Sequence, residues 1–416
     1  MNKKNWLKAA VVCYYLAALA LPWQTKLIVL AAPSDYWEIS IYAAWVFVWL
    51  ALLLGLPSGL FSGNLKWNPL TITASVLSLA GLASATFSSA PYLSFYYLLL
   101  SLSGMAFFVS IRKLAVPVKR NMAVLALSSL TAQAAIGIWQ FVTQLSFSST
   151  LLGIAYHNAG NLGTAVIEVS DGRWLRAYGA SSHPNAFGGL MAIGAIGILY
   201  LFIREKKAVR RLLAGSVFLL FFAGAIVSFS RAAWLALFCA TAVLIWENRR
   251  VLLERWKGFA VLFVFSLLVA AGLFFSYQPL FLVRTQAQGR LEEMSFSDRR
   301  EYDARGWHDF LRDPLSGTGL AASTLADRQR DEAAGKNLPV WSYQPAHDYW
   351  LLAGTEAGIF FLLALGAIWI MAIKKSWTNQ LLALPTALFF LSLFDHWLFS
   401  LPLAPAWVAF LFALMW

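Results

Sequence analysis

Residues 258–277 form the run GFAVLFVFSLLVAAGLFFSY, in which 20 consecutive residues carry no charge. A helix needs roughly 20 predominantly apolar residues to cross the hydrocarbon core of a bilayer. The run is therefore long enough to span a membrane by itself. Arg255 and Lys257 precede it, and basic residues in this position are typical of the cytoplasmic end of a span.

The composition extends this conclusion to the whole chain. Of the 416 residues, 60% are hydrophobic and only 12% are charged, whereas soluble domains carry about 25% charged residues. This excludes an ordinary cytosolic enzyme. Basic loops on one side of a membrane explain the net charge of +12, so we expect no nucleic-acid partner. Cys13 and Cys239 lie inside apolar runs and form no metal-binding or disulfide pattern.

The hydropathy pattern predicts an all-α polytopic membrane protein with about 12 transmembrane helices in a single integral membrane domain, residues 1–416. The first apolar run is expected to remain as a span rather than to be removed as a signal peptide. The spans are expected at about 7–22, 38–56, 69–88, 91–111, 121–143, 186–203, 212–229, 232–247, 258–277, 348–373, 380–397 and 400–416.

The distribution of charge predicts the orientation. An even number of spans places both termini on one side of the membrane. That side receives 19 of the 32 basic residues, Lys66 among them, but only three of the 20 acidic residues. An excess of lysine and arginine marks the cytoplasmic side, so we expect both termini in the cytoplasm.

Two loops on the opposite side are long, at 144–185 and at 278–347, the latter between the ninth and tenth spans. Long loops in compact architectures are usually functional or disordered, and aromatic residues in the second loop argue against disorder. Within it, residues 297–311 predict an amphipathic helix with Ala304, Trp307 and Leu311 on one face. Pro314 is expected to end this helix.

The chain enters the sixth span through Arg176, His183 and Asn185. Arg176 and the free N–H groups of the helix start could cradle an anion. The alternative is an interfacial arginine beside a helix capped by Ser182 or His183. The sequence leaves both interpretations open.

Arg231 interrupts apolar sequence between the seventh and eighth spans. An arginine at membrane depth is costly unless it faces a cavity, a counter-charge or water. It could bind a phosphate at the floor of a cavity or extend outward to water. Glu356, about two turns into the tenth span, is expected to pair with an arginine, and Arg231 is a candidate.

His347 stands where the second long loop enters the tenth span. Its ordinary pKa lies near neutrality, which suits a general base acting on a sugar hydroxyl, although a capping or interfacial histidine is the alternative. Asp395 and His396 are interpreted as a turn. The sequence contains no Asp-x-Asp, His-Glu-x-x-His, nucleotide or P-loop motif. We therefore expect no metal, no cofactor and no ATP-driven pump.

Several of these segments together resemble the O-antigen ligase and polymerase superfamily of bacterial envelope membrane proteins. The resemblance covers roughly residues 170–370 closely. Its segments are Arg-x-x-Gly-x-x-x-His-Pro-Asn over 176–185, Ser-Arg-Ala-Ala-x-Leu from Ser230, an arginine-rich stretch leading to Trp307 with Pro-Leu-x-Gly-x-Gly over 314–319, His-Asp-x-x-Leu from His347, and Glu-Ala-Gly over 356–358.

The resemblance implies transfer of a glycan from undecaprenyl diphosphate to an acceptor hydroxyl, on the periplasmic face of the bacterial inner membrane. His347 would deprotonate the acceptor. Arg176 and one of the pair Arg299 and Arg300 would bind the diphosphate, and Arg231 would shape the same cavity. Guanidinium groups can stabilise the charge that develops on the leaving diphosphate.

The residues His183, Asn185, Asp348 and Glu356 would support this site. Asp348 departs from the family, which usually has Asn, Ser or Gln after the histidine. A nearby carboxylate would raise the pKa of His347. Of the arginine pair, Arg300 is favoured because it shares a helix face with Ala304.

The leading hypothesis is an O-antigen ligase whose acceptor is the lipid A-core of lipopolysaccharide. A polymerase with a glycan acceptor and a protein oligosaccharyltransferase need the same donor and base. A transporter of lipid-linked sugars, the competing class, predicts paired broken helices and internal symmetry, which the sequence does not show. It also leaves the long second loop without a purpose.

Overall fold

The structure is a computed structural model that describes residues 2–62, 67–286 and 289–416. Lys66, which the charge count assigned to the cytoplasmic side, lies outside these ranges.

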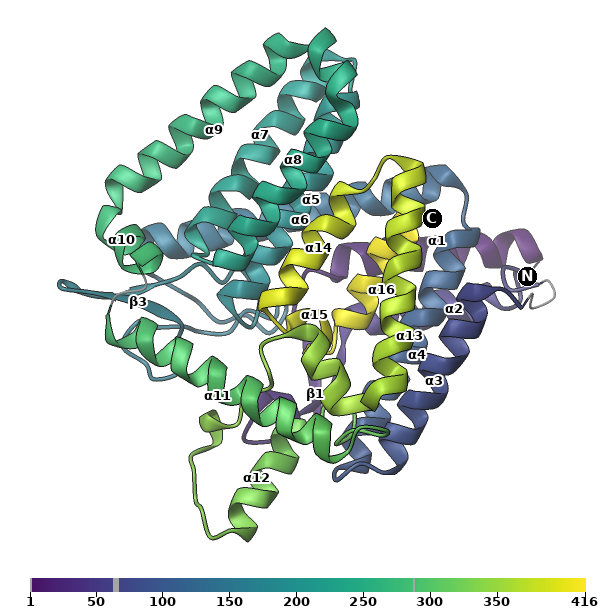
Figure 1. Ribbon diagram of the computed structural model, residues 1–416. Helices are drawn as coiled ribbons and strands as arrows, with labels where there is room; N and C mark the ends of the chain where they lie inside the picture. Colours follow the sequence, from purple (N-terminus) through teal and green to yellow (C-terminus); the bar gives the residue numbers. More distant parts are fainter. Residues whose placement is uncertain (1, 63–66, 287–288) are drawn as a thin grey trace.

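Each of the twelve predicted spans contains a helix (Figure 1). By length and composition, seven described helices are long and apolar enough to cross a membrane, and α2, α14 and α16 are shorter apolar helices. The prediction of an all-α polytopic membrane protein is confirmed, whereas the count of twelve crossings stays a prediction. The helices are α1 (Lys3–Ala20), α2 (Ala43–Gly55), α3 (Pro69–Thr86), α4 (Pro91–Lys113), α5 (Val116–Thr143), α6 (Pro184–Arg204), α7 (Ala208–Val227), α8 (Arg231–Glu254), α9 (Trp256–Ser276), α13 (Tyr349–Asn379), α14 (Ala383–Phe394) and α16 (Ala404–Met415).

The second predicted span was placed too early. The segment from 38 begins with strand β2 (Ile39–Tyr42), which pairs antiparallel with β1 (Lys26–Leu30), so α2 starts only at Ala43. An ion pair of 2.5 Å between Lys26 Nζ and Glu38 Oε1 joins the two ends of this hairpin. Apolar periodicity alone does not separate a short buried strand from the start of a helix, which explains the error.

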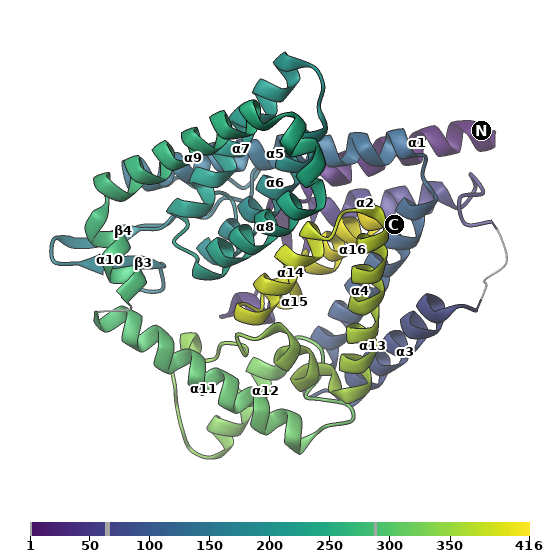
Figure 2. The same cartoon turned by 45° about the horizontal axis from the view of Figure 1, so that its top comes forward.

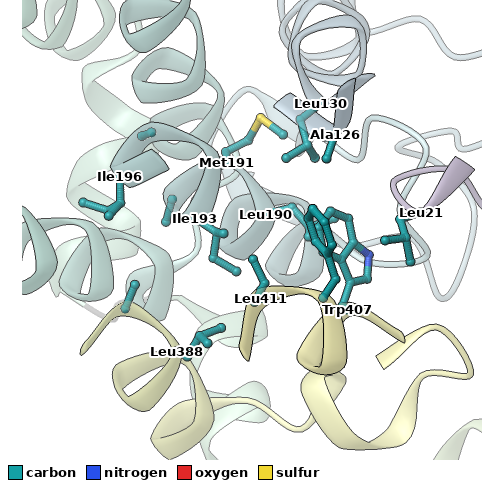
Figure 3. Close-up of a cluster of buried hydrophobic side chains, with 14 of the residues drawn as sticks. Leu21, Ala126, Leu130, Leu190, Met191, Ile193, Ile196, Leu388, Trp407 and Leu411 are labelled. Carbon is teal, nitrogen blue, oxygen red and sulfur yellow. The ribbon is translucent and has the colours of Figure 1, made fainter. Parts of the chain in front are cut away.

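α6 lies at the centre of the helical part. Side chains on all sides of it are buried, and it packs against α7, α8 and α14 (Figure 1). Figure 3 shows Leu190, Met191 and Ile193 of α6 among side chains from four other segments of the chain. A helix that is apolar all round must be buried, in a protein core or in lipid, and α6 is buried by protein.

α9 is the opposite case. It lies at the edge of the molecule (Figures 1 and 2), and Leu262 is its only residue counted as buried among those described. Val261 and Leu268 are 57% and 60% exposed. A helix of this composition at the outside of a polytopic protein faces lipid.

A hairpin and several helices occupy the two long predicted extracytoplasmic loops. The first loop contains the hairpin β3 (Val166–Val169) and β4 (Gly172–Leu175). The second contains α10 (Gln278–Gln286), α11 (Arg290–Arg312), α12 (Ser323–Ala333) and η2 (Val340–Ser342). Figure 1 shows α11 and α12 below the helical part, on the side away from the turn that joins α8 to α9. The remaining short elements are η1 (Asp35–Trp37) and α15 (Trp397–Ser400).

α11 confirms the predicted amphipathic helix, but with the opposite face buried. Trp307 and Leu311 are 54% and 61% exposed, whereas Gly306 and Asp309 are buried. The reason is close packing against α13, because a side chain at Gly306 would press against Ala346 and Thr355. Thr355 Oγ1 donates a hydrogen bond of 2.9 Å to the Gly306 carbonyl, which fixes this face inward.

Candidate active site

Arg176 belongs to a buried polar chain at the start of α6. Its Nη2 donates to Asn185 Oδ1 at 2.7 Å, and Asn185 Nδ2 donates to Asp395 Oδ2 at 2.7 Å. All three side chains are buried. Burial and the positive charges of Arg284 and Arg299 lower the pKa of Arg176.

His183 caps α6, as one of the two sequence interpretations proposed. Its Nδ1 accepts a hydrogen bond from the Asn185 backbone N–H at 3.1 Å, and Ser182 has no such role in the cap. The His183 side chain is exposed. The start of α6 is therefore exposed at His183, two positions before the buried Asn185.

The turn between α7 and α8 is held by two buried arginines. Arg176 Nε donates to the Ser228 carbonyl at 2.8 Å, and Arg284 Nε donates to the Phe229 carbonyl at 2.9 Å. Phe229 has φ +50°, a left-handed conformation that is rare for a bulky residue. The two hydrogen bonds keep this turn in place and thereby fix where Arg231 emerges.

Arg231 pairs with Glu292 and not with Glu356, so that expectation was wrong. Arg231 Nη1 lies 3.5 Å from Glu292 Oε2, and Arg284 Nη1 lies 2.5 Å from Glu292 Oε1. The Arg231 guanidinium also lies over the Phe296 ring at 4.5 Å. Sequence reasoning missed Arg284 and Glu292. A signal was available in Arg284, a lone charge directly after the apolar run 279–283.

His347 lies at the junction of three segments. Its backbone N–H donates to Asp303 Oδ1 of α11 at 2.7 Å. The imidazole stacks on Tyr302, with centroids 5.8 Å apart, and meets the His396 ring edge-on at 5.0 Å. Burial, together with the positive charges of His396 and Arg299, lowers the pKa of His347 to about 2. The ring is therefore neutral at physiological pH.

Asp395 and His396 form the turn between α14 and α15, as interpreted from the sequence, and they also contact the residues of the cluster. Asp395 anchors Asn185 and His396 packs against His347. His396 Nδ1 also lies 2.7 Å from Ser400 Oγ. The pair joins the segments around His183 and His347, which lie more than 160 residues apart in the sequence.

Asp348 does not have the predicted effect on His347. Its Oδ1 accepts from the Leu351 backbone N–H at 2.7 Å and caps α13. The carboxylate turns toward the helix backbone, so burial and the neighbouring positive charges determine the pKa of His347, which is lowered and not raised.

The structure places Arg299, not Arg300, toward the cluster. Arg299 is partly buried, and its charge contributes to the lowered pKa values of Arg176 and His347. Arg300 is exposed on the outward face of α11 with Ala304. The preference for Arg300 assumed that the apolar face of α11 points inward, and this assumption was wrong.

The Glu356 carboxylate holds the start of α12, directly after the glycine-rich segment 314–319. Its carboxylate accepts hydrogen bonds from the Ala321 backbone N–H at 2.6 Å and from Ser323 Oγ at 2.8 Å. α13 is kinked at Gly358, where φ is +75°. The Ile359 N–H donates to the Pro314 carbonyl at 2.8 Å, so two of the segments quoted from the sequence pair through their backbones.

These segments converge at one end of α6, α8 and α13. The predicted residues that the structure brings together are Arg176, His183, Asn185, Arg231, Arg299 and His347. The structure adds Arg284, Glu292, Asp303 and His396 to this cluster. Arg300 lies outside it, and Asp348 and Glu356 form structural hydrogen bonds instead.

No curated protein matches the chain. The profile of a family described as O-antigen ligase matches residues 216–366, which run from α7 through α13 and include Arg231, Arg299 and His347. The resemblance to the O-antigen ligase and polymerase superfamily that was inferred from the sequence is thus confirmed over this region.

Proposed function

We propose that the chain is an O-antigen ligase of the bacterial inner membrane, with both termini in the cytoplasm and the cluster on the periplasmic face. It transfers a glycan from undecaprenyl diphosphate to the lipid A-core of lipopolysaccharide. The observation that carries the proposal is the convergence of a neutral histidine, His347, with the partly exposed arginines Arg231 and Arg299. This arrangement occurs in a chain whose central part matches the ligase family.

The two kinds of arginine have different roles in the proposal. Arg176 and Arg284 already donate to protein acceptors, so they position the turn before α8. Arg231 and Arg299 are partly exposed and bind the donor diphosphate. Charge-assisted hydrogen bonds from guanidinium to phosphate are strong and can be bidentate. Positive charge at this point stabilises the diphosphate as it leaves.

His347 acts as the general base. Its neutral imidazole takes the proton of the acceptor hydroxyl while the hydroxyl oxygen bonds to the sugar carbon. The bond from that carbon to the diphosphate oxygen breaks, and the electron pair leaves with undecaprenyl diphosphate. Attack opposite the leaving group inverts the configuration. The negative donor raises the pKa of His347 when it binds, which strengthens the base only once the substrate is present.

The test uses purified protein in lipid with an undecaprenyl-diphosphate-linked repeat unit, with and without lipid A-core, and resolves products on a gel. A ligase gives product only when lipid A-core is present. A ladder formed from the donor alone would replace this proposal with a polymerase. Product on an added acceptor protein would replace it with a protein oligosaccharyltransferase.

The same assay tests the base. We expect His347→Ala to lower the rate by about 10²- to 10⁴-fold, the usual contribution of a general base. His308→Ala is the matched control, because His308 is exposed on the outward side of α11. Equal rates for the two variants would refute the role of His347. EDTA should leave the transfer rate unchanged. Inhibition of transfer by EDTA would refute a metal-independent mechanism.

A further inference from the structure

A second concentration of arginines lies at the other ends of α6 and α8. It lines a pocket of about 520 Å³. α6 starts at the candidate active site and ends at this pocket, and α8 runs in the same direction (Figure 1). The basic residues of the pocket are Arg204, Lys206, Arg249, Arg250 and Arg255.

The level of the pocket in the membrane follows from the length of α6, which connects the candidate active site to the pocket. α6 has 21 residues, which at 1.5 Å per residue gives about 30 Å, the thickness of the hydrocarbon core. Trp246 and Trp377 lie nearby, 50% and 61% exposed, with their rings 5.7 Å apart. Exposed tryptophans are typical of the membrane interface. The pocket therefore lies at the level of lipid headgroups.

The described lining of the pocket carries five basic residues and one acidic residue, so its charge is strongly positive. Among the residues that the structure describes, none of the five basic side chains forms an ion pair with a carboxylate. Glu247 is the one acidic residue in the described lining. Its Oε1 accepts a hydrogen bond from the Leu382 backbone N–H at 2.9 Å, so it is engaged with the start of α14.

Three of the arginines are held in place. Arg255 Nη1 donates to the Ile203 and Glu205 carbonyls at 3.3 and 3.0 Å. The Arg204 guanidinium lies over the Tyr200 ring at 4.6 Å. Arg249 Nη1 donates to the Trp246 carbonyl at 2.8 Å. These contacts prearrange the guanidinium groups for an anion. The general excess of basic residues on the cytoplasmic side of a membrane would require neither a shared pocket nor such contacts.

We propose that this pocket binds a phosphate group, supplied by the headgroup of an anionic phospholipid. Guanidinium groups match phosphate in charge and geometry. Basic pockets between transmembrane helices are suited to anionic headgroups. The site is independent of the proposed glycan transfer, because it lies at the opposite ends of α6 and α8.

The experiment titrates detergent-solubilised, delipidated protein with phosphatidylglycerol and measures bound lipid by native mass spectrometry. Phosphatidylcholine is the neutral comparison. We expect Arg249→Gln and Arg250→Gln each to weaken phosphatidylglycerol binding about tenfold, the effect of one lost charge-assisted hydrogen bond. Lys374→Gln is the control, because Lys374 is an exposed basic residue near the end of α13 and outside the described lining.

Competition separates the sources of phosphate. A lipid site keeps phosphatidylglycerol bound when inorganic phosphate is added. Displacement by inorganic phosphate would support the phosphate site but assign it to a soluble anion. Unchanged phosphatidylglycerol binding in both arginine variants would overturn the proposal, as would an equal loss in Lys374→Gln. If Arg249→Gln does not fold, Arg250→Gln still tests the proposal.

Discussion

The two faces of α11 differ in a way that reverses the usual pattern of an amphipathic helix. The inward face carries Glu292, Arg299 and Asp303, and the outward face carries Trp307 and Leu311. Apolar residues normally point to the core. Here the polar face contacts the polar cluster of the site, and the apolar face stays exposed. Amphipathicity alone therefore does not show which face of a loop helix is functional in a membrane protein.

The comparison offers two matched pairs of residues, because Glu292 and Arg299 each have an exposed neighbour of the same type. Glu292 stands beside Glu293 and Arg299 beside Arg300. A change to either member of a pair alters the net charge of the chain equally. Different effects within a pair must then come from the position of the side chain and not from its charge alone.

The largest effect on stability is expected for Glu292→Gln. Glu292 lies between Arg231 and Arg284, and it and Arg284 are each 5% exposed. Removing one partner of a buried pair leaves a charge uncompensated and costs about 3 kcal/mol in the free energy of unfolding. Denaturant unfolding in detergent, followed by circular dichroism, measures this loss.

Glu293→Gln is the control for this measurement. Glu293 is exposed, and surface substitutions usually change stability by less than about 0.5 kcal/mol. If both variants unfold at the same denaturant concentration as the unmodified protein, the ion pairs of Glu292 do not stabilise the loop, and the inward face loses its structural role.

The next effect concerns activity. We expect Arg299→Ala to lower kcat/KM about 10- to 100-fold, because a hydrogen bond to a charged group contributes about 1.5–3 kcal/mol. Arg300→Ala should change it by less than about twofold, since Arg300 is exposed on the other face. Steady-state transfer rates at varied donor concentration provide the comparison. If kcat/KM falls more in Arg300→Ala than in Arg299→Ala, the diphosphate binds on the outward face of α11 instead.

The accuracy of the sequence predictions followed the distance over which each interaction acts. The helices inside the predicted spans, the presence of a helix around 297–311 and the His183 cap depend on neighbouring residues. The structure contains all of them, although α11 begins at Arg290, earlier than predicted. Partners distant in sequence were not predictable from local pattern. Glu356 binds the backbone of Ala321 instead of an arginine, and Asn185 reaches Asp395, 210 residues away. Both pairings depend on how α13 and α14 pack.

The smallest expected effect is a change in the pH dependence of transfer. In the free protein the lowered pKa of His347, about 2, keeps the base neutral, so kcat/KM should not fall between pH 8 and pH 5 as it would for a histidine with an ordinary pKa near 6.5. Bound diphosphate raises this pKa, and kcat, which reports the complex, should begin to fall at a higher pH than kcat/KM.

The arginine pair sharpens this test. In Arg299→Ala a positive charge near His347 is lost and the diphosphate is less compensated. Both changes favour the protonated imidazole, so the fall of kcat should move to higher pH by less than about one unit. Arg300→Ala should leave the profile unchanged. A charge that faces His347 must change its protonation equilibrium. Parallel pH profiles of kcat and kcat/KM would therefore mean that the bound donor does not act on His347. An equal shift in Arg299→Ala and Arg300→Ala would mean that Arg299 has no specific effect on it.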